Sequence, residues 1–155
     1  MPYSLNIHIE AWPLAGAFRI SRGTRKVSDV LMVEVNDGNY VGRGECFPYA
    51  RYGEDIDSVQ KQLNSVRSEI EHGLDRQALL NVLAPGAARN AVDCALWDLE
   101  AKRAGLRVWD LANLPAPEPV TTVYTLGVDE PAIMGERARE NSDRPRLKLK
   151  MTGDG

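Results

Sequence analysis

The hydrophobic pattern changes its period twice along this chain, and the order of the periods limits the folds that it can adopt. In the segment SLNIHIE, at residues 4–10, apolar and polar residues alternate, which is typical of a half-buried strand. From residue 55 to residue 114 apolar residues recur every three or four positions, which is typical of amphipathic helices. Beyond the proline-rich stretch LPAPEPV, residues 121–151 predict a strand, a helix and a second strand.

The first part of the chain predicts an α+β module. Two β-rich runs flank Asp37-Gly38, a strong hairpin signal because both residues tolerate positive φ angles. With residues 4–10 these runs form a small antiparallel sheet, while the polar segment RISRGTRKVSD at 19–29 is expected to be a loop. Helices are expected at residues 55–73, 75–83 (with Asp75 as its cap) and 86–105, with a further turn or two at 107–114. The helix at 86–105 should bury one stripe of Ala88, Val92, Ala95, Leu96 and Leu99.

The second part of the chain predicts a βαβ unit with parallel strands. Asp129 is the expected cap of its helix. Parallel sheets are normally covered on both faces, which a single βαβ unit cannot achieve. We therefore expect two domains, at residues 1–117 and 118–155, and further protein packed on residues 120–151.

Composition excludes several classes of function. The chain has 155 residues, a formal net charge of −3, and basic residues scattered among acidic ones, which argues against a nucleic-acid surface and against a polybasic membrane patch. Its first residues lack the layout of a signal peptide, so a cytoplasmic protein is expected. Cys46 and Cys94 stand in no Cys-x-x-Cys pattern and are expected to be buried free thiols.

Lys148 and Lys150 form the pattern that indicates a catalytic role most clearly. In a strand they point to one face, and Leu147 and Leu149 point to the other. On the edge of an open sheet such lysines simply discourage aggregation. In a closed parallel barrel they would project inward near the carboxyl end of the strand, where a lysine can act as a general base.

Two other motifs carry alternative interpretations. The segment GRGE, residues 42–45, lacks the third glycine of a dinucleotide-binding fingerprint, so a tight turn at a strand end is expected. Arg19, Arg22 and Arg25 surround Gly23, and are either solvated or a clamp that can close over a carboxylate.

Taken in order, the segments GRGECFPYARYGE, GAARNAVDCALWDLEAKRAG, YTLGVDEP and LKLK resemble the amino-terminal part of the enolase superfamily. Within its muconate-lactonizing subgroup the chain is most similar to dipeptide epimerases of the L-Ala-D/L-Glu type. The resemblance implies an α+β capping domain (antiparallel sheet plus helices) followed by the first βαβ unit of a (β/α)₇β TIM-like barrel. It also implies an isomerase that uses Mg²⁺ and two lysine bases to remove and return the α-proton of a dipeptide.

The same resemblance assigns roles to individual residues. Lys150 corresponds to the first base, and Lys148 to the companion that favours its neutral form and contacts the substrate carboxylate. Thr125 corresponds to a position near the bound dipeptide. Arg25 corresponds to the arginine that pairs with the substrate's acidic side chain, with Arg22 as a second choice. Tyr52 belongs to the segment ARYGE, the other loop that closes the pocket.

Three acidic metal ligands and the opposing lysine have no counterpart up to residue 155, so we expect the Mg²⁺ ligands beyond it and expect this chain alone to be inactive. A homo-oligomer and a small-molecule dipeptide substrate are the expected partners. Two alternatives remain: a muconate cycloisomerase or o-succinylbenzoate synthase of the same subgroup, and a non-catalytic interaction module whose exposed strands pair with a partner or with another copy.

Overall fold

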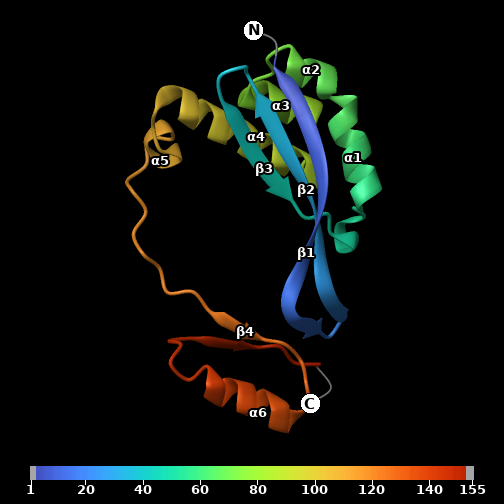
Figure 1. Cartoon of the computed structure of the whole chain (residues 1–155), viewed down its shortest axis with the longest axis vertical. Helices are drawn as coiled ribbons and strands as arrows, with labels where there is room; N and C mark the ends of the chain where they lie inside the picture. Colours follow the sequence, from blue (N-terminus) through green and yellow to red (C-terminus); the bar gives the residue numbers. More distant parts are fainter. Residues whose placement is uncertain (1–2, 153–155) are drawn as a thin grey trace. The chain divides into compact units, whose positions relative to one another are not determined.

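The computed structural model describes residues 3–152 and divides into two compact units (Figure 1). The first unit comprises Met1–Trp12 and Asp29–Ala116, and the second comprises Pro13–Ser28 and Pro117–Gly155. The first two strands of the chain contribute residues to both units. Their turn and the adjoining strand residues, 13–28, belong to the second unit, and we name this part the distal hairpin.

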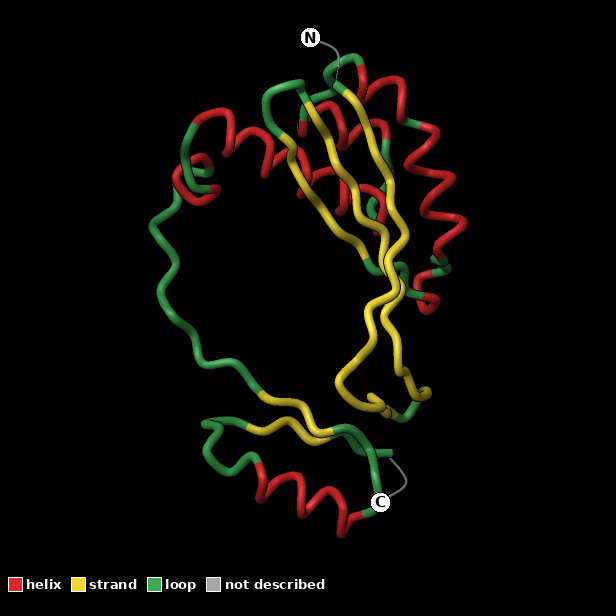
Figure 2. Tube along the Cα trace, in the orientation of Figure 1, coloured by secondary structure: helices red, strands yellow, loops and turns green. Residues whose placement is uncertain are grey.

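The sheet has the strand order β1-β2-β3, with β1 at Ser4–Ile20, β2 at Gly23–Asn36 and β3 at Val41–Cys46 (Figure 2). Strands β2 and β3 are antiparallel, with Leu31 opposite Cys46 and Asn36 opposite Val41. The predicted hairpin at Asp37-Gly38 is confirmed. The backbone amides of Tyr40 and Asn39 donate to the Asp37 carboxylate, and these bonds hold the pKa of Asp37 below its usual value.

The expectation of a loop at residues 19–29 was wrong. Strand β1 continues to Ile20 and β2 begins at Gly23, so only Ser21 and Arg22 form the turn between them. Most side chains of this distal hairpin are exposed. A strand without a buried face has no need of an apolar alternation, which is why the pattern did not reveal it.

The helices of the first unit are η1 at Ala50–Tyr52, α1 at Ile56–Ser65, α2 at Arg67–Glu71, α3 at Arg76–Val82, α4 at Ala87–Ala104 and α5 at Val108–Leu111. The single helix expected at 55–73 is interrupted at Val66, whose φ and ψ of −110° and 11° are not helical. The predicted cap at Asp75 is confirmed, because its side chain accepts from the Ala78 amide at 2.7 Å.

The core of the first unit lies between the sheet and α4, which covers one of its faces (Figures 1 and 2). The predicted stripe on this helix is confirmed: Ala88, Val92, Ala95, Leu96 and Leu99 are all buried. The expectation of a turn at residues 42–45 was wrong, because Gly42 and Gly44 lie inside β3. A β-carbon on either glycine would overlap the backbone of α4, so they allow the helix to lie directly on the strand.

The second unit contains β4 at Tyr124–Leu126, α6 at Pro131–Glu140 and β5 at Leu147–Leu149. Strands β4 and β5 are parallel, as predicted for a βαβ unit. The cap expected at Asp129 was wrong: the N-cap of α6 is Glu130, whose side chain makes no capping bond. Asp129 precedes that cap: its Oδ1 accepts from the Glu130 amide at 3.0 Å, and its Oδ2 forms an ion pair with Arg137 of α6 at 3.0 Å. None of the helices in the described part of the chain is long and apolar enough to span a bilayer.

Candidate functional site

The parallel ladder of the second unit brings three of the predicted site residues to one face. Thr125 on β4 lies directly opposite Lys148 on β5, and paired residues of a parallel ladder point to the same side. The backbone amide of Lys150 donates to the carbonyl of Leu126 at 3.0 Å, so the ladder continues past the end of β5. Lys150 therefore falls on the face of Lys148 and Thr125. Lys150 and Thr125 are half-buried, and Lys148 is exposed.

The distal hairpin docks on the end of β4 within the same unit. The Val128 amide donates to the carbonyl of Arg19 at 2.9 Å. A β-carbon on Gly127 would lie 3.1 Å from that carbonyl oxygen, closer than an ordinary contact, so glycine permits this approach. The two segments are about a hundred residues apart in sequence, and nothing in the pattern of either one predicts the contact.

A pocket of about 530 Å³ lies between the distal hairpin and β4. Two predicted substrate-binding residues, Arg25 and Thr125, line it together. Sequence reasoning missed the other lining residues, because a single sequence carries no signal for them; they are Leu14, Ala15, Gly16, Ala17, Phe18, Ser28, Tyr124, Leu126, Gly127 and Arg137. The wall combines apolar side chains with the guanidinium groups of Arg25 and Arg137, and Arg137 is also paired with Asp129 at 3.0 Å.

The remaining predicted residues lie elsewhere. Arg22 is exposed in the two-residue turn of the hairpin and does not line the pocket. Lys148 and Lys150 are likewise outside its lining. Tyr52 belongs to the first unit, where it ends η1 and is 76% exposed.

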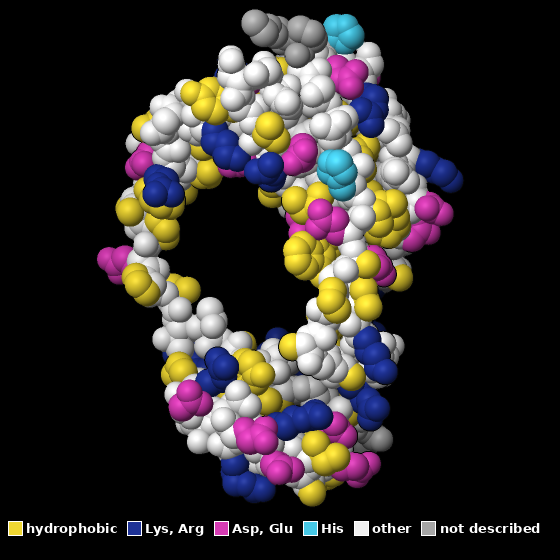
Figure 3. All heavy atoms as spheres, in the orientation of Figure 1, with side chains coloured by type: hydrophobic (Ala, Val, Ile, Leu, Met, Phe, Trp, Pro, Cys, Tyr) yellow, Lys and Arg dark blue, Asp and Glu magenta, His cyan; other side chains and the backbone are white. Residues whose placement is uncertain are grey.

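The residues that the structure describes do not by themselves form a magnesium site. Across residues 3–152 no three His, Cys, Asp or Glu side chains are grouped so that they could hold a metal ion. Acidic, basic and apolar side chains are interspersed over the face of the molecule shown in Figure 3.

The two cysteines differ in their environment. Cys46 is buried on β3, as expected, whereas the expectation for Cys94 was wrong because it is exposed on α4. Burial raises the pKa of the Cys46 thiol to about 11, and the nearby Glu54 carboxylate adds to the rise.

Comparisons with known proteins identify the family to which this chain is related. Residues 3–112 match the family model of the mandelate racemase / muconate lactonizing enzyme N-terminal domain. Among curated proteins, the chain is 44% identical to the L-Ala-D/L-Glu epimerase of Escherichia coli K12 over 135 residues, which are 87% of this chain and 42% of that protein. It is 33% identical to an N-acetyl-D-glutamate racemase of a Pseudoalteromonas species over 126 residues, which are 79% of this chain and 39% of that protein.

Solved structures show the same likeness. An enolase family member from Agrobacterium tumefaciens, with homology to dipeptide epimerases and solved with sodium and L-Ala-L-Glu, is 46% identical with a TM-score of 0.92; the match covers 97% of this chain and 46% of that one. A dipeptide epimerase from Enterococcus faecalis, complexed with Mg and L-Leu-L-Tyr, is 26% identical with a TM-score of 0.82, over 97% of this chain and 46% of the other. The chain thus spans less than half the length of these relatives. From its fold and these matches, the chain belongs to the mandelate racemase / muconate lactonizing enzyme family, as an N-terminal domain with an antiparallel sheet and helices.

Proposed function

We propose that this chain is the amino-terminal part of a dipeptide epimerase of the enolase superfamily, an isomerase that inverts the α-carbon of a C-terminal glutamate. The main support is the 46% identity and 0.92 TM-score with a protein that binds L-Ala-L-Glu. The 44% identity to an L-Ala-D/L-Glu epimerase points to the same substrate class.

The proposed roles follow the arrangement of the second unit. Lys150 accepts the α-proton of the dipeptide as the general base. Lys148, two residues before it on the same face, contacts the substrate carboxylate. Thr125 lies opposite Lys148 and also lines the pocket, so it is placed to contact the dipeptide.

Selectivity for an acidic substrate is assigned to Arg25. Its half-buried guanidinium lines the pocket and can pair with the side-chain carboxylate of glutamate. Arg22, exposed in the adjacent turn, is the second choice for this role. Tyr52 is assigned to the loop that closes over the bound dipeptide.

Magnesium is part of the proposal for the whole enzyme only. Relatives from Enterococcus faecalis and Methylococcus capsulatus were solved with Mg and a dipeptide. Because residues 3–152 contain no suitable group of ligands, we place the metal ligands and the second lysine beyond residue 155 and assign no step of metal chemistry to this chain. We accordingly propose that residues 120–151 are covered by the rest of a barrel or by another copy, that the protein is a cytoplasmic homo-oligomer, and that this chain alone is inactive.

A second candidate is racemisation of an N-acylated glutamate. It is favoured by the 33% identity to an N-acetyl-D-glutamate racemase. The reacting α-carbon and the side-chain carboxylate are the same in both candidates, and only the group on the glutamate nitrogen differs. Kinetics with L-Ala-L-Glu and N-acetyl-L-glutamate, measured in parallel, distinguish them by the larger kcat/KM.

A hybrid protein tests the proposal. In it, this chain replaces the matching segment of the Escherichia coli epimerase, which supplies the remainder of the molecule. We expect the hybrid to convert L-Ala-L-Glu to L-Ala-D-Glu in the presence of Mg²⁺, and to exchange the glutamate α-proton with deuterated solvent. A hybrid that unfolds cooperatively, yet neither epimerises nor exchanges the α-proton of either substrate, would contradict the proposal.

A further inference from the structure

Strand β3 is an end strand of its sheet, so in the part of the chain that the structure describes one of its edges has no neighbouring strand (Figure 1). In an antiparallel sheet the backbone N–H and C=O groups of successive residues turn alternately to one side and the other. Every second residue of β3 therefore presents its backbone groups at the outer edge. An unpaired edge of this kind is a template with which another chain can pair.

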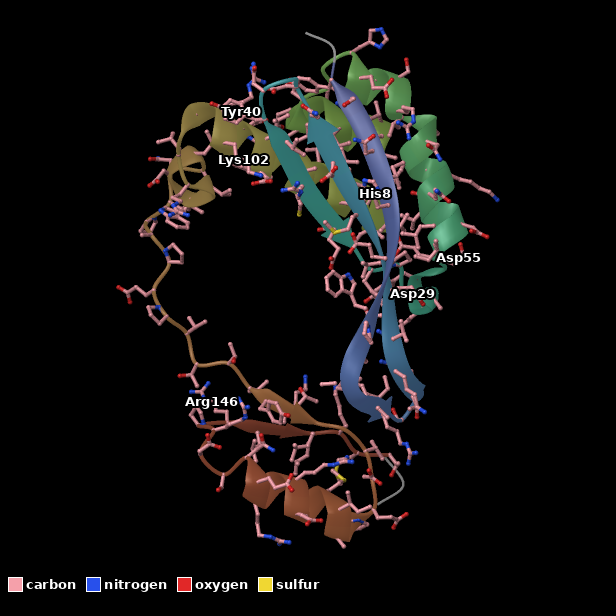
Figure 4. All side chains as sticks on the ribbon, viewed as in Figure 1. His8, Asp29, Tyr40, Asp55, Lys102 and Arg146 are labelled. Carbon is pink, nitrogen blue, oxygen red and sulfur yellow. The ribbon has the colours of Figure 1, made fainter. Side chains whose placement is uncertain are left out.

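Asp98 and Lys102 of α4 occupy one end of this edge. Oδ2 of Asp98 accepts from the Arg43 amide at 2.8 Å, and Nζ of Lys102 donates to the Val41 carbonyl at 2.7 Å. The two side chains also pair with each other, Nζ to Oδ2, at 2.6 Å. Figure 4 shows Lys102 on α4 beside the start of β3. Together they occupy one acceptor and one donor with which a neighbouring strand would pair.

Asn90 of α4 occupies the other end of the edge. Its side-chain amide donates to the Glu45 carbonyl at 3.2 Å. Positions 90, 98 and 102 differ by multiples of four, so the three side chains project from the same face of α4. We name Asn90, Asp98 and Lys102 the edge stripe. It occupies one backbone group of each of three alternate residues of β3, which are Val41, Arg43 and Glu45.

The two glycines of β3 make this edge accessible and also bring the edge stripe to it. Gly42 and Gly44 have no side chains to obstruct an approaching strand, and glycine-rich strands specify their pairing register weakly. The same glycines let α4 lie directly on β3, since a β-carbon at Gly42 would overlap the Ala95 carbonyl oxygen. Side chains on the flank of α4 therefore reach the edge of the strand.

The opposite edge of the sheet, on β1, is covered in a similar way. The Tyr3 amide donates to the Glu71 carbonyl at 2.9 Å, and the Arg67 guanidinium donates to the Leu5 carbonyl. Arg67 and Glu71 both belong to α2. Groups of a helix thus occupy backbone sites at each edge of the sheet.

We propose that the edge stripe prevents a second copy of this chain from pairing with β3. Without the stripe, β3 of two copies would align antiparallel about a two-fold axis and continue the sheet from one molecule into the other. The three bonds are exposed, so water satisfies the freed backbone groups and removal of the stripe opens the edge without unfolding the first unit. This role involves residues of the first unit alone and is independent of the proposed function.

Hydrogen exchange in the full 155-residue chain, at low concentration, tests whether the edge opens. We expect Asp98→Ala/Lys102→Ala to speed exchange of the Arg43 amide about fivefold, the effect of one lost hydrogen bond. Asp98→Asn retains an acceptor oxygen and should keep most of the protection. The control is Arg89→Ala/Asp93→Ala, which removes the same two charges from positions four residues apart on α4 but outside the edge stripe, and should leave the Arg43 amide unchanged.

The dependence on concentration tests whether a second copy takes the open edge. As the concentration of Asp98→Ala/Lys102→Ala rises, we expect the protection of the Arg43 amide to return. Labelling of the exposed Cys94 with iodoacetamide should slow at the same time, because Cys94 lies between Asn90 and Asp98 on the same face of α4. In the natural chain and in the control, neither measurement should depend on concentration.

Asn90→Ala provides a second, independent variant, because it frees the Glu45 carbonyl at the other end of the edge. Its Cys94 labelling should also slow as the concentration rises. Circular dichroism during urea unfolding identifies which variants fold, and the folded ones decide. Exchange of the Arg43 amide in Asp98→Ala/Lys102→Ala that equals the control, or Cys94 labelling of the folded variants that is the same at every concentration, would overturn the proposal.

Discussion

A β-carbon added to Gly44 would overlap the backbone carbonyl oxygen of Ala91, because α4 lies directly on β3 at this point. The same β-carbon would also lie 2.8 Å from the Ala95 amide nitrogen, so the backbone of α4 obstructs it at two atoms. Neither group can move without separating the helix from the sheet that forms the core of the first unit.

Gly44→Ala should therefore destabilise the first unit by about 3 kcal/mol, at the upper end of the range for overpacked cores. Urea unfolding followed by circular dichroism measures the loss. Gly16→Ala is the control, because a β-carbon at Gly16 meets nothing within 4 Å and should change the unfolding free energy little. Equal midpoints for the two variants would show that the helix does not need the glycine.

The capping box at Asp55 predicts a pH-dependent contribution to stability. Hydrogen bonds from the Ser58 amide and hydroxyl hold the pKa of Asp55 below its usual value. A carboxyl group with a depressed folded-state pKa stabilises above its unfolded pKa, and the contribution is lost as pH falls through the folded value. Asp55→Ala should thus be less stable than the natural chain at pH 7, and the difference should shrink towards pH 2. A difference that is constant across this range would contradict the assignment.

The buried thiol of Cys46 predicts the opposite trend at alkaline pH. Its pKa is raised from 9.0 to about 11, so between these values the folded chain keeps a proton that the unfolded chain has lost. The contribution of the protonated Cys46 thiol to the free energy of unfolding is complete below pH 9, and it decreases by about 2–3 kcal/mol as pH rises to 11. The free energy of unfolding of Cys46→Ala, subtracted from that of the natural chain at each pH, isolates this contribution.

The different exposure of Cys94 and Cys46 predicts that the two thiols react differently with alkylating reagents. Cys94 is exposed and should react with iodoacetamide in the folded chain, whereas buried Cys46 should react only after unfolding. Mass spectrometry of the labelled chain, before and after addition of urea, counts the modified thiols at each stage. Labelling of both cysteines at equal rates in the folded chain would contradict the burial of Cys46.

Lys150→Ala in the hybrid enzyme should reduce exchange of the substrate α-proton from one stereoisomer by at least about 100-fold, the usual contribution of a general base. Exchange from the other stereoisomer should survive better, because a lysine outside this chain is proposed to serve it. Lys61→Ala, on the exposed side of α1, is the control and should leave both exchange rates unchanged. Retained exchange from both stereoisomers would remove Lys150 from the mechanism.

Arg25→Ala should raise KM for L-Ala-L-Glu roughly 10- to 100-fold, as expected for the loss of a charged hydrogen bond. It should have little effect on a dipeptide that lacks the side-chain carboxylate. Arg22→Ala tests the alternative, and should have a small effect because Arg22 does not line the pocket. A larger rise in KM with Arg22→Ala would transfer the role to that residue.

Features set by neighbouring residues were predicted well. The hairpin at Asp37-Gly38, the cap at Asp75 and the buried stripe of α4 were all correct, because each depends on residues within a few positions of one another. The parallel pairing of β4 with β5 was also correct, since the helix between them imposes that direction. The break at Val66 was missed because apolar residues keep their helical spacing across it.

Contacts between distant segments were not predicted. Gly44 was read as part of a turn, although the backbone of α4 is the reason for the glycine. The Glu54 carboxylate accepts from the Ala87 amide, and the Arg19 carbonyl accepts from the Val128 amide. Each bond joins segments far apart in sequence, and the residue pattern of one segment does not predict its contact with the other. Among the candidate site residues, the chemistry of Lys148 and Lys150 was suggested by their alternation, but the register with Thr125 came from the ladder itself.

The sequence by itself determined most elements of this protein and their order, because strand alternation, helical spacing and turn residues act over a few positions; it did not reveal the hairpin strands of residues 13–28, whose side chains are mostly exposed. The tertiary structure decided which backbones approach closely enough to require glycine, which carboxylate caps α4, and which side chains share a pocket with Arg25 and Thr125. Such choices depend on the distance between surfaces that meet only when the chain has folded, and a linear pattern of residue types does not contain that distance.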